Sequence, residues 1–474
     1  MVIQARRSSL WKPHQWRFRT VNCTDREVGV FLPVRHSVQV LIKAKVRAGF
    51  QQALRAGTLR RLALTRILVG GCLMLGLTLE DLQILTEFTA EVRRPSGLMK
   101  AFALTPLHGF LLSHPSALLF AQVTCFFCLL AVTLGLKTRI AIGLSLLLQT
   151  LIGGLLREHS IFYHSEQLLI LLLAILLFTP CAAVWSFDAR LQSRQPSEAL
   201  KDQASLAVFL IWASLATAYW SGGISKIIGA GWNWFDADGL RVRLLACGLD
   251  PIEYGFGGAI QLAAQPDWVF VVLATIVLGM EMVAPLLLFS RRARLLLPLG
   301  YISFHIAVFV LQNILFLELI LLQVIFMACP GLPERKTMPG AVSPWHLPMT
   351  FIALGIVLGT LALTAVQRDF YPLSAYKMYA KPANFPLRHS QIIDSDGEVV
   401  QRIGRLRGRK QLGLYIARAG KECVALQRPG PCTVMRHVIK KQLEKSGLSE
   451  GGYRLRVLSR RKDGSDDLLG EVPL

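Results

Sequence analysis

The sequence predicts an all-α polytopic membrane bundle of about eight to nine transmembrane helices, followed by a small α+β soluble C-terminal domain. Three observations lead to this fold class. Of the 474 residues, 53% are hydrophobic and only 17% are charged, whereas a soluble domain usually carries about 25% charged residues. The mean hydropathy is +0.45. Apolar runs of about 18 or more residues recur along most of the chain, as in proteins that cross membranes.

The basic charge is concentrated in the two flanks of the chain. The net charge is +22. Residues 1–61 hold 13 Lys and Arg against 2 acids, residues 368–474 hold 21 against 11, and the remainder hold 18 against 17. Cationic flanks beside a bilayer usually contact anionic lipid. We therefore predict membrane lipid as a partner and no nucleic acid.

Residues 1–60 form a basic N-terminal segment. Val38, Ile42, Val46, Phe50 and Leu54 recur every four residues with lysines between them. This period is typical of a helix that lies in the membrane interface. An ordinary soluble amphipathic helix explains the pattern equally well, so both interpretations stay open.

The apolar stretches between residues 61 and 370 are the candidate spans of the transmembrane domain. The seventh and eighth stretches are short and contiguous, so they form either two tight helices or one broken element. Pro298 is expected to kink the seventh. The candidate spans are 62–80, 115–136, 139–157, 166–185, 204–229, 268–290, 294–311, 313–329 and 347–366.

Lysines and arginines in the short loops predict the orientation of the chain. They occur after the second, fourth, sixth and eighth candidate spans, at Lys137, Arg139, Arg190, Arg194, Lys201, Arg291, Arg292, Arg294, Arg335 and Lys336. Basic loops face the cytoplasm in membrane proteins. We therefore expect a cytoplasmic N-terminus, with the loops near 81–114, 157–165 and 230–267 and the C-terminal domain on the extracytoplasmic side.

The C-terminal domain, residues 385–474, is expected to be a small α+β module. Asp396-Gly397 indicates a hairpin between strands 391–394 and 398–403. Residues 433–445 are typical of a helix, and residues 453–458 of a further strand. Cys423 and Cys432 would form a disulfide if this module faces an oxidising compartment. Cys125 and Cys128 lie inside an apolar run and are interpreted as core packing, so no metal site is predicted.

Ionisable side chains inside the apolar core mark the candidate site, because a charge at the bilayer centre costs about 3 kcal/mol. These side chains are Lys226, Glu281, His305, Glu318, His164 and Glu166. Lys226, His164 and His305 are expected to converge on a cavity that opens to the outer side. A lysine in such a cavity favours its neutral amine, which can act as a base.

Each of these residues also has a purely structural interpretation. Lys226 could extend to the outer surface, and His164 could be interfacial. Glu281 could be neutral and hydrogen-bonded within the bundle, and His305 could be a satisfied core histidine. Gly222-Gly223 most simply permits close helix approach.

Three segments of the chain resemble the HTTM (horizontally transferred transmembrane) family, whose membrane domain is shared with vitamin K-dependent γ-carboxylase. The first is Tyr163-His164-Ser165, an apolar span and Trp185-Ser186-Phe187-Asp188. The second is Gly223-Ile-Ser-Lys226-Ile-Ile, with Trp232 six residues later. The third is Phe304-His305 followed by Gln312-Asn313. The resemblance covers about residues 60–370 and includes a tail at residues 371–379. It implies a bacterial-type, multi-pass protein of the plasma (inner) membrane.

The resemblance also implies a reaction and a cofactor. In the carboxylase, a lysine deprotonates reduced vitamin K, and oxygen then converts the quinol into a strong base. This base removes a γ-proton from a peptide glutamate, and the carbanion captures CO2. By resemblance, Lys226 is the catalytic lysine, and His164 and His305 are catalytic histidines near a reduced quinone. The carboxylase has two adjacent lysines where this chain has Ser225-Lys226, and a much larger C-terminal region.

Two function hypotheses follow from these observations. The first is a carboxylase-like, quinol-dependent lyase that acts on a secreted peptide or protein. The second is a non-enzymatic membrane protein for peptide maturation, export or partner binding. A transporter is a weaker third hypothesis, because the two halves of the chain show no internal repeat.

Overall fold

The fold was analysed in a computed structural model of the chain. It describes residues 58–159, 164, 166–192, 197–249, 256–327, 346–377, 380, 385–401, 423, 429–445 and 452–473. The interfacial helix predicted around residues 38–54 lies outside the described residues.

The described chain is mostly helical, and six of its helices are long and apolar enough to cross a membrane. These helices are α2 (Leu59–Leu79), α5 (Pro115–Leu134), α6 (Thr138–Glu158), α9 (Glu198–Ala230), α14 (Arg291–Gln312) and α16 (His346–Ala365). Two further apolar helices are shorter, α7 (Gln167–Leu176) and α15 (Leu317–Met327). The predicted membrane bundle is therefore present, while six long spans rather than eight or nine are found among the described residues.

The difference in the number of spans has local causes. The stretch 166–185 yields only α7, because the helix gives way to turns before Pro180. The stretch 268–290 is broken into α12 (Asp267–Met282) and α13 (Leu286–Phe289). Pro285 explains this break, because proline has no N–H to donate and disfavours helical backbone at the residue before it.

The seventh and eighth candidate spans are two separate helices. Helix α14 continues past Pro298 to Gln312, and Asn313 ends it in the left-handed conformation at φ 58°. Helix α15 then begins at Leu317. The amide of Asn313 joins two other segments, because its Nδ2 donates to the Cys247 carbonyl and its Oδ1 accepts from the Phe256 N–H.

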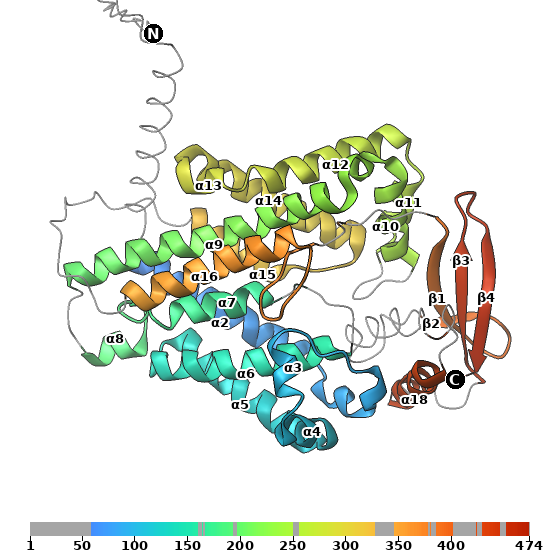
Figure 1. The fold of residues 1–474 in the computed structure, drawn as a ribbon, viewed down its shortest axis with the longest axis horizontal. Helices are drawn as coiled ribbons and strands as arrows, with labels where there is room; N and C mark the ends of the chain where they lie inside the picture. The colour runs from blue at the N-terminus through green and yellow to red at the C-terminus, as the bar shows by residue number, and fades with distance from the viewer. Residues whose placement is uncertain are drawn as a thin grey trace, which may run out of the picture. The chain divides into compact units, whose positions relative to one another are not determined.

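Helix α9 is the centre of the bundle. It packs against α2, α7, α12, α13 and α16, and it runs beside α16 in Figure 1. In its apolar window 67% of the residues are buried, against 22% to 50% in the other five long helices. An apolar helix that is buried on most sides occupies the core of its domain. The residues carried by α9 are therefore held more firmly than those of the outer helices.

One end of the bundle is built around Asp188 and Arg66. Asp188 accepts hydrogen bonds from the N–H groups of Lys137 (2.9 Å) and Thr138 (2.8 Å) and from the Thr138 hydroxyl (2.7 Å). Arg66 is fully buried and donates to the carbonyls of Cys181 (3.3 Å) and Trp185 (2.6 Å). These bonds join the loops after α5 and α7, both predicted to face the cytoplasm.

A segment that we call the strap, residues 369–377, closes the other end of the bundle. The Tyr371 hydroxyl donates to the Thr150 carbonyl on α6 (2.9 Å), and Gln167 of α7 donates to the Pro372 carbonyl (2.5 Å). The Ser225 hydroxyl of α9 donates to the Ala375 carbonyl (2.8 Å). These bonds fix the strap across three helices of the bundle.

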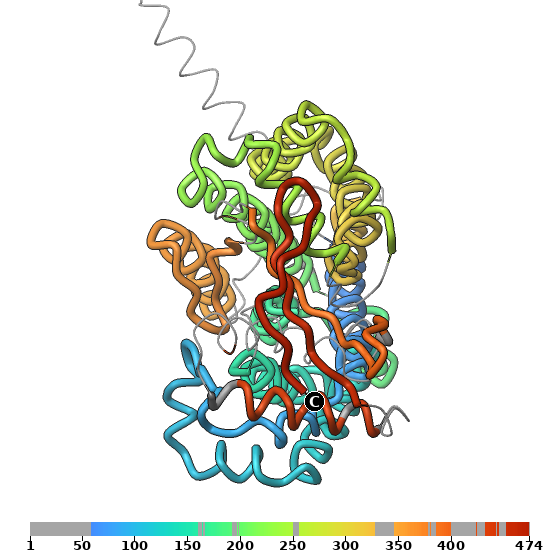
Figure 2. Tube along the Cα trace, turned by 90° about the vertical axis from the view of Figure 1, so that its right-hand side faces the viewer, coloured from blue at the N-terminus to red at the C-terminus, as the bar shows by residue number. Residues whose placement is uncertain are grey.

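The C-terminal module contains a four-stranded antiparallel sheet in the order β2-β1-β3-β4. The strands are β1 (Leu387–Ile393), β2 (Val399–Gln401), β3 (Arg454–Arg460) and β4 (Asp466–Pro473). The hairpin predicted at Asp396-Gly397 joins β1 to β2, and the predicted helix is α18 (Pro429–Lys445). Strand β4 was not predicted; it pairs with β3 across a turn at Asp463-Gly464, seen in red in Figure 2.

Contacts join the module to segments at the strap end of the bundle. Lys441 of α18 pairs with Glu87 in η1 (Leu82–Glu87), and Lys462 pairs with Asp238 in α10 (Ala237–Leu249). Both partners lie in loops predicted to share a side of the membrane with this module. Which side that is stays a prediction.

We predict that Asp188→Ala lowers the melting temperature of the detergent-purified protein. The substitution leaves three donors of the α6 N-terminus without their acceptor, and the loss of such a cap costs about 1–2 kcal/mol. Thermal unfolding followed by tryptophan fluorescence measures the change. Asp202→Ala, on α9, is the matched control and should unfold like the parent. An unchanged melting temperature for Asp188→Ala would contradict the capping role.

We also predict that Cys423 and Cys432 are bonded in the native membrane. The two cysteines form a disulfide in the structure. Disulfides persist where the compartment is oxidising, so the bond is expected only if the module is extracytoplasmic. Alkylation before and after reduction, followed by peptide mass spectrometry, checks this, with Cys72 as the free thiol for comparison. Alkylation of Cys423 without reduction would contradict both the bond and the orientation.

Candidate functional site

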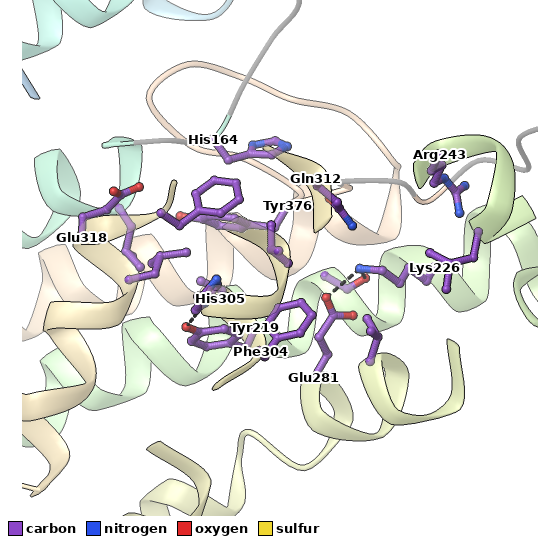
Figure 3. Close-up of a pocket in the computed structure, with 18 of the residues that line it drawn as sticks. His164, Tyr219, Lys226, Arg243, Glu281, Phe304, His305, Gln312, Glu318 and Tyr376 are labelled. Carbon is purple, nitrogen blue, oxygen red and sulfur yellow. Dashed lines mark hydrogen bonds and ion pairs between the residues drawn. The ribbon is translucent and has the colours of Figure 1, made fainter. Parts of the chain in front are cut away.

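A buried cavity lies between α9, α10, α12, α14, α15 and the strap, and it holds all three predicted site residues. His164, Lys226 and His305 line it together (Figure 3). It contains about 1020 Å³ of empty space, including its open mouth, and its walls are mainly apolar. Ligand sites in proteins have this mixture of an apolar lining with a few polar groups. The structure thus brings together residues that are up to 141 positions apart in the sequence.

Lys226 is paired with Glu281 across the gap between α9 and α12. Lys226 Nζ lies 2.7 Å from Glu281 Oε1, and the two residues are only 3% and 9% exposed. The interpretation that Lys226 extends to the surface is therefore wrong. Glu281 is hydrogen-bonded within the bundle as expected, but its partner is the predicted catalytic lysine. The base expected from the sequence is thus one half of a buried acid–base pair.

Glycines on α9 let the two helices come close enough for this pair. A Cβ at Gly222 would lie 3.3 Å from Glu281 Oε1, and one at Gly223 would lie 3.0 Å from Met282 Sδ. The second distance is tighter than side chains normally tolerate. The prediction that Gly222-Gly223 permits close helix approach is confirmed.

Trp234 separates the buried pair from a second cation. The Lys226 ammonium lies 5.3 Å from the centre of the Trp234 ring, and the Arg243 guanidinium lies 5.1 Å from it. Both are within the range of a cation–π contact. Trp234 Nε1 donates to the Ala274 carbonyl of α12 (3.1 Å), which fixes the ring. Sequence reasoning selected Trp232, which is 89% exposed, and missed Trp234 two residues later.

His305 is held in a hydrogen-bonded chain of side chains. Gln323 Nε2 donates both to the Leu319 carbonyl (3.1 Å) and to the Tyr219 hydroxyl (2.9 Å), so its amide orientation is set. The Tyr219 hydroxyl oxygen lies 2.8 Å from His305 Nε2. Because Gln323 already donates to this hydroxyl, its own proton is available for His305. Neutral His305 therefore accepts at Nε2 and carries its proton on Nδ1.

His164 enters the cavity from the chain that precedes α7. Its Nδ1 lies 2.8 Å from the Ser374 hydroxyl, and its ring lies 5.5 Å from the Tyr376 ring. Both partners belong to the strap. Sequence reasoning noted this tail but assigned it no part in the site. Sequence patterns are local, so they could not place the tail, whose Ser374 is 210 positions from His164.

Four buried polar atoms around the cavity have no hydrogen-bond partner among the described residues. They are Glu281 Oε2, His305 Nδ1, the Tyr376 hydroxyl and Gln312 Oε1. All four residues line the cavity (Figure 3). A buried polar atom without a partner costs about 1–3 kcal/mol. Because these four atoms share one cavity, a single ligand there can complete their hydrogen bonds.

These features define a class of protein, a polytopic helical membrane protein with a buried and partly polar cavity. A sequence model of the HTTM domain matches residues 55–330, which is more than half of the chain. The chain therefore belongs to the HTTM family, as its three sequence segments predicted. None of the curated proteins and none of the solved structures in the comparison matches the chain.

We predict that Lys226 and Glu281 depend on each other for stability. Removing one partner leaves the other charge buried, which costs about 3–5 kcal/mol, whereas replacing both with apolar groups is often neutral. Lys226→Met and Glu281→Leu should each lower the melting temperature, and the double variant should recover most of the loss. Thermal unfolding of all four proteins in one detergent measures this. Additive losses in the double variant would show that no such coupling exists.

Proposed function

We propose that this HTTM protein binds a reduced quinone in the cavity and uses the Lys226–Glu281 pair to take up its hydroxyl proton. The reaction would be coupled to proton abstraction from a secreted peptide or protein, as in the carboxylase that the sequence resembles. The observation that carries the proposal is the buried Lys226–Glu281 pair, whose second carboxylate oxygen has no partner among the described residues. That oxygen is an acceptor facing a mainly apolar cavity.

The residues of the cavity fit a lipophilic molecule with oxygens on a ring. The mainly apolar walls suit the ring and its chain. The His305 Nδ1–H is a donor for one ring oxygen, and Glu281 Oε2 is an acceptor for a hydroxyl. The quinone class would supply an acidic hydroxyl and, with oxygen, the oxidising chemistry of the reaction.

Because Lys226 is paired with Glu281, either residue can accept the proton of the quinol hydroxyl, whereas the sequence predicted Lys226 alone as the base. If Lys226 is an ammonium and Glu281 a carboxylate, then Glu281 accepts the proton and Lys226 stabilises the negative charge that develops nearby. If the pair is neutral, then Lys226 is the acceptor. Both arrangements remove one proton in a buried, mainly apolar site, where such a charge interaction is strong. Lys226 and Glu281 therefore act as one base.

The route for a peptide substrate is proposed from the ends of the bundle. The strap and α10 line the cavity, and the C-terminal module contacts α10 through Lys462. A peptide approaching from the extracytoplasmic side would meet this end. The proposal therefore includes the predicted orientation and the plasma (inner) membrane.

The test uses protein in lipid nanodiscs with reduced vitamin K, oxygen, labelled CO2 and a glutamate-containing peptide. We expect quinol oxidation that depends on the protein, and labelled peptide. Lys226→Ala and Glu281→Gln should each lower the rate by about 10²- to 10⁴-fold, as expected for the loss of a general base. Lys201→Ala, on the same helix, should keep the parent rate.

Two outcomes would overturn this proposal. One is the absence of quinol oxidation and of labelled peptide with the parent protein. The other is an activity that is the same in the parent protein and in Lys226→Ala. The first result would favour the non-enzymatic function in peptide maturation or partner binding, and the second would exclude Lys226 as the base.

A further inference from the structure

The strap carries two polar side chains that the matched HTTM segment does not contain. It begins at Asp369, after α16, whereas the match ends at residue 330. Ser374 and Ala375 are fully buried in it. The bond from Ser225 to the Ala375 carbonyl ties it to α9 next to Lys226. The strap therefore lies at the proposed reacting pair and is not a peripheral tail.

Asp369 is held as an acceptor by its surroundings. Its Oδ1 accepts from the Ser374 hydroxyl (2.7 Å) and from the Ala375 N–H (3.1 Å). Its Oδ2 lies 3.0 Å from Lys377 Nζ. All three groups around this carboxylate are donors, so Asp369 is the acceptor in each contact.

The hydrogen-bond partners of the Ser374 hydroxyl determine its contact with His164. The single hydroxyl proton of Ser374 is donated to Asp369, and the Tyr376 N–H donates to the same hydroxyl oxygen (2.9 Å). The hydroxyl therefore has no proton for His164, although His164 Nδ1 lies 2.8 Å away. The contact is a hydrogen bond only if His164 Nδ1 carries the proton and Ser374 accepts it.

We infer that Asp369 and Ser374 are positioning residues that hold neutral His164 in its Nδ1–H tautomer, with the lone pair on Nε2. The chain runs from His164 Nδ1–H to the Ser374 oxygen, and from the Ser374 hydroxyl to Asp369. A carboxylate that fixes a histidine tautomer through the nitrogen remote from the chemistry is a known way to prepare a base. Here a serine stands between the carboxylate and the imidazole.

The two histidines of the cavity then have different tasks. His305 accepts at Nε2 from Tyr219, so its unpaired Nδ1–H is a donor. His164 donates at Nδ1 to the strap, so its Nε2 is an acceptor. The assignment of His164 to a reaction rests on the proposed function, whereas its tautomer does not.

The tautomer is measured by nitrogen NMR of protein with ¹⁵N-labelled histidine in nanodiscs at about pH 8, above the ordinary histidine pKa of about 6.5. His164→Gln assigns the signal by removing it. In the parent protein we expect a protonated Nδ1 and an unprotonated Nε2 at His164. An Nε2–H tautomer at His164 would overturn the inference. This test needs neither a strap variant nor an activity assay.

Two variants separate the roles of the two positioning residues. In Asp369→Ala the Ser374 hydroxyl loses its acceptor and can turn its proton to His164 Nδ1, so the tautomer should switch to Nε2–H. In Ser374→Ala the constraint is lost, so the Nδ1–H fraction should fall. Ser205→Ala, on α9, is the matched control and should leave the His164 signal unchanged. A His164 signal that is identical in Asp369→Ala and the parent would contradict the relay.

The same variants connect the inference to the proposed function. If quinol oxidation is found, Ser374→Ala should lower kcat by about 10-fold or more with little change in KM, because the tautomer affects the reaction and not the binding contacts. Ser374→Thr, which keeps the hydroxyl, should restore kcat. If no oxidation is found in the parent protein, the proposed function fails while the NMR result still decides the tautomer. A parent-like kcat in Ser374→Ala, together with an altered tautomer, would overturn the role of the relay in the reaction.

Discussion

A buried charge in an apolar bundle must be neutralised inside the bundle, and the arrangement around Lys226 depends on this constraint. Gly222 and Gly223 leave room for the Glu281 and Met282 side chains of α12 beside α9, where Glu281 pairs with Lys226. Glu281 also lies just before the break at Pro285, where the predicted span becomes two helices. The pair, the glycines and the broken helix are thus one structural solution. It places an acid and a base side by side in a mainly apolar cavity.

Buried polar groups at the two ends of the bundle also find hydrogen-bond partners inside the protein, but these partners are mainly backbone carbonyls and side-chain donors. Arg66 is fully buried, and its cost is offset by hydrogen bonds to the Cys181 and Trp185 carbonyls in the turns that follow α7. At the other end the strap satisfies its own backbone with Gln167, Ser225 and Leu98. Around the cavity, Glu281 Oε2 and His305 Nδ1 have no hydrogen-bond partner among the described residues, and both residues line one space that a ligand can enter.

The sequence predicted the bundle, the C-terminal hairpin and helix, and the three residues that line the cavity. These predictions succeed because apolar runs, turn residues and costly ionisable side chains are local signals. The partners of those residues could not be predicted in this way. Glu281 lies 55 positions from Lys226, and Ser374 lies 210 positions from His164. Arg66 was missed: it stands about one turn inside the candidate span 62–80, and it was not among the ionisable side chains selected from the apolar core.

The matched HTTM segment and the strap beyond it contribute different parts of the cavity. Lys226, Glu281, His164 and His305 all fall within residues 55–330, so the matched segment contains the proposed base and both histidines. Asp369 and Ser374 fall outside it. The nitrogen of a neutral histidine that faces a reaction is a base or a donor, according to which of its two nitrogens carries the proton. At His164 we infer that the strap determines this tautomer. Within one family, a change in this short segment could therefore alter the chemistry of the cavity while the bundle and the matched residues stay the same.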